Sequence, residues 1–256
     1  MSTKMKRILS VTLTVLCLGV FIYAAYGLID TAIDYYKNWK VLNNVQEKFY
    51  AAGPDEVDES VIDSNSDSIR SGFDILLKEN EDLVGWITIE DTQIDYPILK
   101  ADNNVEYLTQ GFYKEDNIAG SIFMDFRNDV ETPGLNTIVY GHRMKDGSMF
   151  EQLEKYQDKD FFKSHQTFQF DTLYDSYEAE IFAVYNTTTD FNYIQTDFAS
   201  DAAYEQLLTR TKEESMYETD VEVSARDQII TLSTCDYELD DHDGRLVVQA
   251  KLVKKG

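Results

Sequence analysis

The stretch that decides the fold is IITLSTCD, residues 229–236, together with GRLVV at residues 244–248. The first run is apolar and branched almost to its end, as in a buried strand, and Cys235 stands where that strand meets a polar loop. The loop is acidic and closes with a glycine, and a second apolar run follows it. Two such runs predict antiparallel neighbours. We therefore expect Cys235 and Arg245 to lie side by side.

The charge of the chain excludes one class of partner. The 256 residues carry a formal net charge of −24. Three of the 23 basic residues, Lys4, Lys6 and Arg7, lie within the first seven positions, so the remainder carries 20 basic residues against 47 acidic ones. A nucleic-acid partner would require a surface that neutralises phosphates, and we expect none. The balance fits a soluble domain that works outside the cell, although solubility alone would explain it.

The N-terminal region contains a predicted membrane anchor. Residues 8–29 are mostly apolar and uncharged, long enough to cross a ~30 Å hydrocarbon core as a helix. The basic residues of segment 1–7 predict that the N-terminus stays in the cytoplasm and that the chain after Asp30 lies outside. A cleaved signal peptide is the alternative, but the run is long and lacks a small-x-small cleavage site. A lipoprotein signal would need a small residue before Cys17, where Leu16 stands.

The segment 30–69 is predicted to be a helical stalk followed by an acidic linker. Apolar residues keep a helical spacing over 31–52, which suits a helix that packs on the domain or stands off the membrane. Residues 53–68 hold six acids and no bases, as in a linker or mobile loop. A short helix is expected over about 71–81.

Beyond Leu83 the pattern changes to short apolar runs typical of strands. Before the opening stretch they cover residues 84–89, 94–99, 121–125, 136–141, 166–173 and 177–185. With the two strands around Cys235 this makes eight strands, in one domain over residues 70–256. The predicted fold is mostly β with peripheral helices, and an antiparallel or mixed eight-stranded β-barrel is the most economical architecture.

Three details refine this outline. Pro97 predicts an edge or bulge position for the second strand. A short helix is expected at 149–156. The polar connection 186–227 is expected to contain a helix from 199 or 201 to about 214, and a connection of that length within a compact domain is usually functional.

Few side chains can carry chemistry. Cys17 lies within the apolar run, so no disulfide with Cys235 is expected, and Cys235 is either inert or reactive. Of the three histidines, His142 ends a predicted strand, which suits an imidazole in a cleft. His165 is expected on a surface turn, and His242 lies in an acidic loop, where a solvated side chain is the simpler interpretation.

A thiol, an imidazole and a guanidinium together suit acyl transfer from a peptide-like substrate. The thiol attacks as a thiolate, for which it needs a nearby base or positive charge. A histidine can take its proton and later return one to a leaving amine. An arginine can hold a carbonyl or stabilise an oxyanion. No metal ion or other cofactor is expected, because one cysteine and scattered histidines lack ligand spacing.

These residues lie in motifs that resemble those of the sortases. TLSTC at 231–235, with Arg245 ten residues after the cysteine, is similar to the sortase signature. NTIVYGH at 136–142, followed by MKDGSMF at 144–150, resembles the histidine segment of class B sortases. So do VGWI at 84–87 and the later YPI, and the resemblance covers about residues 83–252.

The resemblance implies a membrane-anchored cysteine transpeptidase on the outer face of a Gram-positive cell, with an eight-stranded β-barrel. By this analogy Cys235 is the nucleophile, His142 the general acid and base, and Arg245 the group that stabilises substrate and oxyanion. The enzyme would cleave a surface protein after the threonine of its C-terminal sorting signal. A thioester acyl-enzyme would form, and an amine of a cell-wall precursor would resolve it.

Other assignments remain open at the sequence level. Ser233 contacts the sorting peptide or is a core serine. Asp236 orients a neighbour or contacts substrate, or is a surface carboxylate. The connection 186–227 resembles a class B insertion that shapes the peptide groove. Two features depart from the expected pattern: residues 240–243 are unusually acidic beside Arg245, and the stalk is longer than the fold requires.

Three alternative functions are kept. A cysteine hydrolase or a pilin polymerase would use the same three residues, the first with water and the second with a lysine of another protein as acceptor. A tethered, non-catalytic surface protein would keep Cys235 merely buried.

Overall fold

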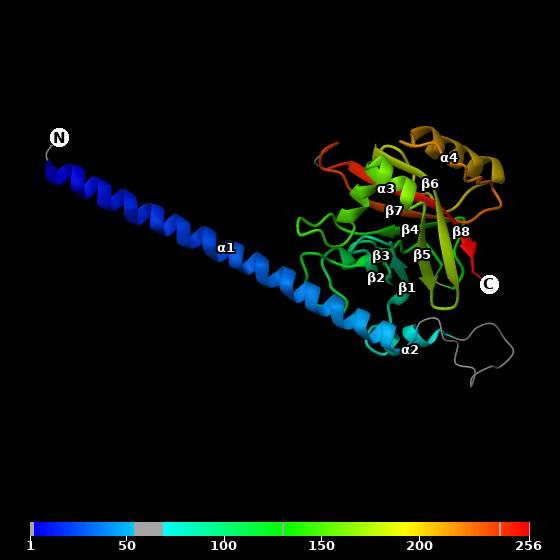
Figure 1. Cartoon of the computed structure of the whole chain (residues 1–256), viewed down its shortest axis with the longest axis horizontal. Coiled ribbons are helices and arrows are strands. Elements are labelled where there is room, and N and C mark those ends of the chain that lie inside the picture. The colour runs from blue at the N-terminus through cyan, green and yellow to red at the C-terminus, as the bar shows by residue number, and fades with distance from the viewer. Residues whose placement is uncertain (1–2, 54–68, 130, 241, 256) are drawn as a thin grey trace. The chain divides into compact units, whose positions relative to one another are not determined.

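The computed structural model describes residues 3–53, 69–129, 131–240 and 242–255 (Figure 1). They fall into two compact units, one up to Lys40 and the other from Val41 onward. Most of the predicted acidic linker, residues 54–68, lies outside the described residues.

The second unit is a closed barrel of eight strands in the order β1-β2-β3-β4-β7-β8-β6-β5 (Figure 1). The strands are β1 (Leu83–Thr88), β2 (Asp95–Leu99), β3 (Ile122–Met124), β4 (Asn136–Tyr140), β5 (Thr167–Thr172), β6 (Ser176–Thr188), β7 (Ile229–Cys235) and β8 (Gly244–Lys254). The β2–β3 and β4–β7 pairs are parallel, and the others are antiparallel. The predicted eight-stranded mixed barrel is therefore confirmed.

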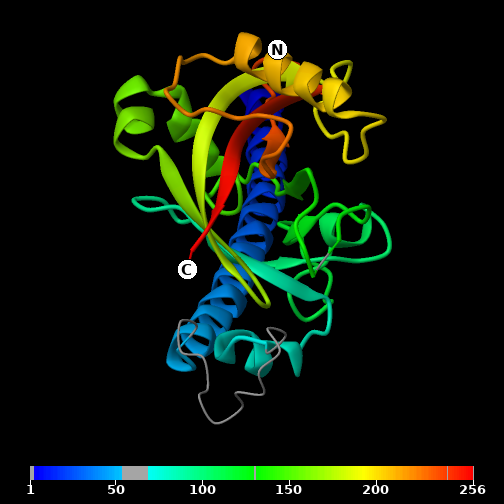
Figure 2. The same ribbon diagram turned by 90° about the vertical axis from the view of Figure 1, so that its right-hand side faces the viewer.

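The longest pairing in the barrel joins β6 and β8, which run side by side (Figure 2). Both strands carry continuous buried apolar runs, residues 181–185 and 246–248, because one face of each strand packs into the barrel core and the other face packs into a cluster that includes residues of α4 (Asp201–Glu214). The resulting core is made of buried aliphatic and aromatic side chains from all eight strands, and it also includes Phe150 and Leu153.

Phe150 directly precedes the 3₁₀ helix η3 (Glu151–Gln157), so the barrel core extends to the chain segment that follows β4.

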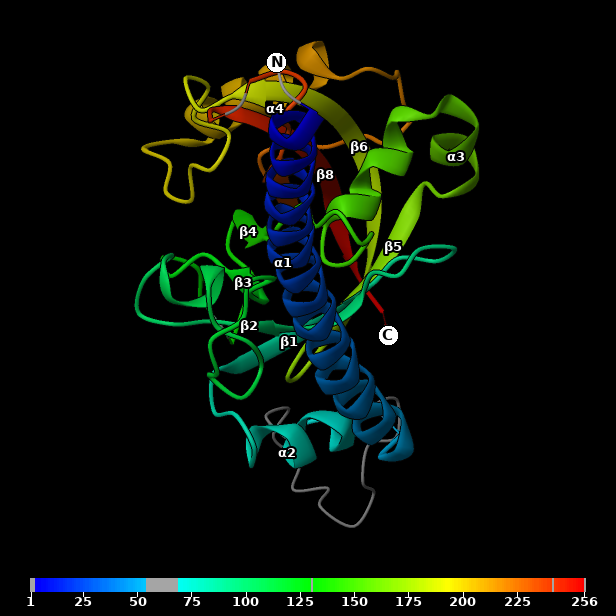
Figure 3. The same ribbon diagram turned by 90° about the vertical axis from the view of Figure 1, so that its left-hand side faces the viewer.

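The helices are peripheral to the barrel. They are α1 (Thr3–Ala51), α2 (Ser71–Leu77), α3 (Lys159–Ser164) and α4 (Asp201–Glu214), with 3₁₀ helices η2 (Glu106–Leu108) and η3. α3 leads directly into β5 (Figure 3). α4 begins where predicted, since the Ser200 hydroxyl caps it by accepting a hydrogen bond from the Ala203 N–H, and its apolar face packs beside β6.

Two local predictions differ from the structure in part. The helix expected over about 71–81 ends at Leu77, because Asn80 forms a hydrogen-bonded turn there, its side-chain amide donating to the Phe112 carbonyl at 2.8 Å. Of the edge or bulge position predicted for Pro97, the edge is wrong, because a closed barrel has none and β2 lies between β1 and β3, whereas the β1–β2 pairing does carry a register shift close by, between Leu83 and Gly85. Pro97 is tolerated because pairing with β3 begins only at the next residue, Ile98.

The N-terminal unit contains the one helix, among the described residues, that is long and apolar enough to cross a membrane. α1 is continuous from Thr3 to Ala51, so the helical pattern predicted over 31–52 is confirmed. The apolar side chains of its first half are exposed, as expected of a segment whose surroundings are not protein.

The last turns of α1, from Val41, belong to the barrel unit. Phe49 stacks on Trp86 of β1 with ring centroids 4.0 Å apart and an interplanar angle of 4°. It also meets Phe73 of α2 edge-on at 5.1 Å. Phe49 and its neighbour Val45 are fully buried, so this end of α1 completes a second apolar cluster against the barrel.

We predict that Phe49→Ala lowers the free energy of unfolding of the barrel by about 3–5 kcal/mol, because it leaves a cavity beside the rings of Trp86 and Phe73. Chemical denaturation of the full-length protein in detergent, followed by tryptophan fluorescence, measures this. Ile75→Ala on α2 is the control: Ile75 is 41% exposed, and its loss should change stability by less than about 1 kcal/mol. Equal effects of the two substitutions would contradict the packing role of Phe49.

Candidate active site

A pocket of about 230 Å³ opens where β4 and β7 end and β8 begins. The end of β4 and the two residues after it supply residues 140–142, β7 supplies residues 233–235, and β8 supplies Arg245. The remaining lining comes from Asn104, Leu108 and Phe123. The reason for this convergence is the parallel pairing of β4 with β7, in which Tyr140 lies opposite Ser233. The residues that follow each strand therefore emerge at the same end of the barrel.

Cys235 and Arg245 are side by side, as the sequence predicts. They are directly paired in the antiparallel β7–β8 ladder. Arg245 is oriented by its own loop, since its Nη1 donates to the carbonyls of His242 at 3.0 Å and Gly244 at 2.7 Å. Gly244 is required there, because a Cβ on it would lie 2.0 Å from the Asp236 carbonyl oxygen.

His142 lines the same pocket and is held by a backbone carbonyl. Its Nε2 lies 2.8 Å from the carbonyl oxygen of Leu108. A carbonyl can only accept a hydrogen bond, so Nε2 carries the proton in the neutral ring and Nδ1 is left as the basic nitrogen. Leu108 is in turn supported by Gly120, which has φ +58° and packs against its carbonyl.

Arg143, which the sequence analysis did not single out, connects the histidine segment to the loop after Cys235. Its guanidinium pairs with Glu154 of η3 and lies 3.9 Å from an Asp236 carboxylate oxygen. It also lies 5.9 Å from the centroid of the Tyr237 ring, within reach of a cation–π contact. In the sequence, only its position next to His142 could have indicated that Arg143 lies near the site, because its partners come from distant segments.

Tyr237 contacts the thiol from the loop side. Burial raises the pKa of Tyr237, and the charge of Cys235 and its hydrogen bond with the tyrosine raise this pKa further. Tyr237 therefore keeps its proton at neutral pH and can donate it toward the sulfur.

Ser233 and Asp236 occupy different environments. Ser233 lines the pocket but is only 3% exposed, and its Oγ lies 2.8 Å from the Tyr193 hydroxyl. Asp236 is not a surface carboxylate, because it is 4% exposed. Its Oδ1 accepts the backbone N–H groups of Glu238 at 3.0 Å and Leu239 at 3.3 Å, so it shapes the turn after Cys235.

The other two histidines lie outside the pocket lining. The surface turn predicted for His165 is wrong: the residue caps α3, and its side chain is 12% exposed because it stacks on Phe161 at 4.0 Å. Its Nε2 lies 2.9 Å from an Asp91 carboxylate oxygen. His242 is exposed, and its contribution is the backbone carbonyl that orients Arg245.

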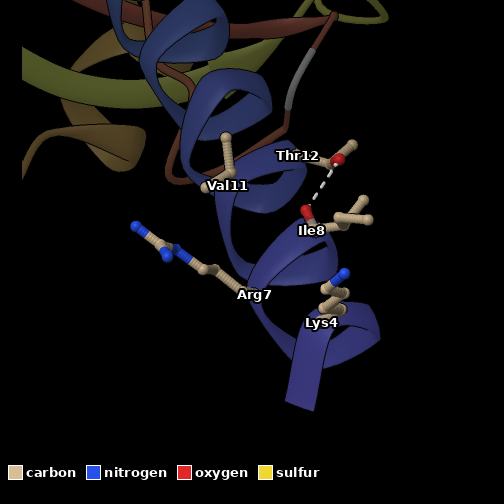
Figure 4. Close-up of a pocket in the computed structure, with 5 residues that line it drawn as sticks. All are labelled: Lys4, Arg7, Ile8, Val11 and Thr12. Atoms are coloured by element: carbon tan, nitrogen blue, oxygen red, sulfur yellow. Dashed lines mark hydrogen bonds between the residues drawn. The ribbon is translucent and has the colours of Figure 1, made fainter. Parts of the chain in front are cut away.

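The described residues were also compared with the requirements of a metal site and of a second pocket. No group of three His, Cys, Asp or Glu side chains among them is arranged to hold a metal ion. A second hollow lies along α1 and is lined by residues of that helix alone, between Lys4 and Thr12 (Figure 4). There the Thr12 hydroxyl donates to the Ile8 carbonyl of its own helix at 3.0 Å, which is ordinary for a helical threonine.

Comparison with known proteins identifies the family. The family described as "Sortase domain" matches residues 87–253. The chain belongs to the sortase family. It is 44% identical over 252 residues to sortase B of Listeria monocytogenes, a match that covers 98% of this chain and all of that protein. The resemblance to class B sortases is confirmed, and the protein is a cysteine transpeptidase of that family.

The solved sortase B structures share the whole barrel. Sortase B from B. anthracis in complex with AAEK1 superposes with a TM-score of 0.77 at 49% identity, covering 87% of this chain and 99% of that one. A Staphylococcus aureus sortase B–substrate complex superposes with a TM-score of 0.76 at 37% identity, covering 88% of this chain and 100% of that one. The closed barrel described above is therefore the sortase B fold.

We predict that Gly120→Ala lowers kcat/KM for transpeptidation about tenfold without unfolding the barrel. A Cβ at Gly120 would lie 2.7 Å from the Leu108 carbonyl oxygen, which must move, and His142 would lose its orientation. Steady-state kinetics and circular dichroism measure the two effects. Gly134→Ala is the matched control, since a Cβ there meets nothing within 4 Å. Full activity of Gly120→Ala would show that the Leu108 carbonyl does not orient His142.

Proposed function

We propose that this sortase cleaves a C-terminal sorting signal after its threonine and joins the surface protein to a cell-wall amine. The observation that supports the proposal is the convergence of three groups on one pocket: Cys235 and Arg245 from the neighbouring strands β7 and β8, and His142 from the distant segment that follows β4. Each of the three groups has one role in such a reaction: nucleophile, acid and base, and electrostatic support.

In the first step the Cys235 sulfur attacks the carbonyl carbon of the threonine. Its proton passes to the basic nitrogen of His142, and the resulting imidazolium later gives a proton to the departing amine. The C–N bond breaks and a thioester remains. Arg245 stabilises the negative oxygen of the tetrahedral intermediate. Its guanidinium is already held in place for this role by hydrogen bonds to the carbonyls of its own loop.

In the second step an amine of a cell-wall precursor attacks the thioester. The amine loses a proton to His142, the C–S bond breaks, and the thiol is regenerated. The Tyr237 hydroxyl beside the sulfur assists departure of the thiolate by donating a hydrogen bond to it.

The pocket lining combines polar residues, among them Asn104 and Thr234, with the apolar side chains of Leu108 and Phe123. The S. aureus sortase B described above has been solved as a substrate complex, and that structure covers 88% of this chain. A sorting-signal peptide is therefore the substrate class that we assign to the pocket.

The N-terminal helix supports a place at the cell membrane. We assign residues 1–7 to a cytoplasmic tail, 8–29 to a single-pass anchor, 30–69 to an extracellular stalk and linker, and 70–256 to the catalytic domain. The uncharged run and the basic residues before it support this topology. An anchor of this kind would hold the pocket outside the cell, where surface proteins and cell-wall precursors meet.

Substitution of the three site residues tests the assignment of roles. Cys235→Ala and His142→Ala should each abolish turnover of a fluorogenic sorting-signal peptide. Arg245→Ala should still form the acyl-enzyme, at a rate lower by about 100-fold or more, because an oxyanion partner is lost. Mass spectrometry of the trapped thioester measures acylation directly.

His242→Ala is the control for the histidine assignment. Only the backbone of His242 contacts Arg245, so the substitution should leave turnover near normal. A severe loss in this variant, or full activity in Cys235→Ala, would overturn the proposal.

Transpeptidation and hydrolysis are distinguished by their products. Peptide turnover is run with and without an added amine acceptor, and the products are identified by mass. We expect the amide product to replace the free acid when the amine is present. Free acid under both conditions would favour the cysteine hydrolase, and a product formed only with a lysine of a second protein would favour the pilin polymerase.

A further inference from the structure

A buried carboxylate lies behind the pocket wall. Asp125 follows β3 and is 0% exposed. Its Oδ1 accepts hydrogen bonds from the Arg127 backbone N–H at 3.0 Å and from Arg127 Nε at 2.7 Å. Its Oδ2 accepts three more, from Arg127 Nη2 at 2.7 Å, Asn104 Nδ2 at 2.8 Å and the Tyr140 hydroxyl at 2.8 Å. Five donors therefore converge on one side chain that does not itself line the pocket.

Two of these donors belong to residues that form the pocket wall. Asn104 is held at both ends of its amide, because its Oδ1 accepts the Phe126 backbone N–H at 2.9 Å while its Nδ2 donates to Asp125. The direction of the Asn104 amide is thus fixed by its partners. Tyr140 is similarly committed as a donor, since burial and the charge of Asp125 raise its pKa and keep its hydroxyl protonated.

The third residue that donates to Asp125, Arg127, extends the network to the connection between β6 and α4. Arg127 Nη2 also donates to the Ile194 carbonyl at 3.0 Å. The hydroxyl of the preceding residue, Tyr193, lies within hydrogen-bond distance of the Ser233 hydroxyl, and Ser233 lines the pocket. The segment around Ile194 is therefore connected to the pocket both through Arg127 and through Tyr193. The chain on either side of Ile194 is further tied to the barrel by Asn136, whose amide donates to the Tyr193 and Gln195 carbonyls.

The charge of Asp125 is stable in this position. Burial by itself raises the pKa of Asp125, but the hydrogen bonds from Arg127, Tyr140 and Asn104 outweigh burial and leave the pKa below its ordinary value. The carboxylate is therefore ionised at neutral pH. An ionised, fully bonded carboxylate holds its donors in one arrangement, and its removal leaves several of them without an acceptor.

We propose that Asp125 is a positioning residue for the substrate peptide, which fixes the pocket wall through Asn104 and Tyr140 and ties the Ile194 segment to it through Arg127. Asp125 touches neither the reacting thiol nor the peptide. Asp125 acts by holding Asn104 and Tyr140 of the pocket wall in one arrangement before the peptide binds. The inference rests on the proposed function, because it assumes that a sorting-signal peptide occupies this pocket.

The test is Asp125→Asn in the full-length protein in detergent, with the sorting-signal peptide that the wild-type protein turns over. We expect KM to rise about tenfold, as for the loss of a well-placed hydrogen-bond acceptor, while kcat changes less than about threefold. The rate of Cys235 alkylation in a Cys17→Ser background should stay unchanged, because the thiol and its immediate partners are not altered.

Asp171→Asn is the matched control. Asp171 on β5 is also a buried carboxylate paired with an arginine, Arg70, at 2.8 Å, but it is not part of the pocket lining. Its substitution should lower the unfolding temperature as Asp125→Asn does, with KM unchanged. An equal rise of KM in both variants would mean that general loss of stability explains the effect, and would overturn the inference.

Two further variants keep the test decisive if Asp125→Asn does not fold. Arg127→Gln changes a residue outside the pocket lining and should raise KM through loss of the Ile194 tie. Asn104→Ala combined with Arg127→Gln should raise KM by less than the product of the two single effects, because both act through Asp125. Wild-type KM in Arg127→Gln, or fully multiplicative effects, would refute the positioning role.

The outcomes also separate this inference from the proposed function. If the wild-type protein turns over no sorting-signal peptide, the proposed function fails. If the wild-type protein is active and Asp125→Asn is folded with wild-type KM, only the positioning role fails.

Discussion

The parallel pairing of β4 with β7 is the constraint on which the site depends. It places Tyr140 opposite Ser233, so the chain leaves both strands at the same end of the barrel. His142 and Cys235 follow within two residues of these partners and line one pocket. An antiparallel pairing of the same two strands would have sent them to opposite ends, because successive residues would run in opposite directions.

The loops around the pocket hold its functional groups through backbone atoms. The Leu108 carbonyl sets the protonated nitrogen of His142, and the loop carbonyls before β8 set the direction of Arg245. Backbone groups suit this task because their positions are fixed by the fold and carry no side-chain entropy. The side chains that add to them, Arg143 and Asp125, do so by joining segments that are distant in the sequence.

Electrostatics in this strongly acidic chain is local. The net charge of −24 does not indicate that two arginines lie at the site, Arg245 paired with Cys235 across the β7–β8 ladder and Arg143 paired with Glu154 and Asp236. The acidic residues near the site are engaged: Asp236 accepts backbone hydrogen bonds, and Asp240 does the same for the turn before β8. Asp236 and Asp240 therefore stabilise the turns of this loop, which gives a structural reason for acidic residues close to Arg245.

The sequence by itself determined the strands, the continuous N-terminal helix and the Cys235–Arg245 pair. Each of these depends on local periodicity or on a short connection, and both can be read from a single segment of the sequence. The exact ends were less well determined, as the helix that stops at Leu77 shows, because a distant partner such as Phe112 decides them.

Only the tertiary structure decided that His142 and Cys235 line one pocket, that Asp236 is buried, and that Arg143 and Asp125 lie beside the site. Asp125 carries no motif, and its partners Asn104, Tyr140 and Arg127 are spread over three segments. No periodicity in one segment records such contacts. They exist only once the barrel has closed and brought those segments to the same carboxylate.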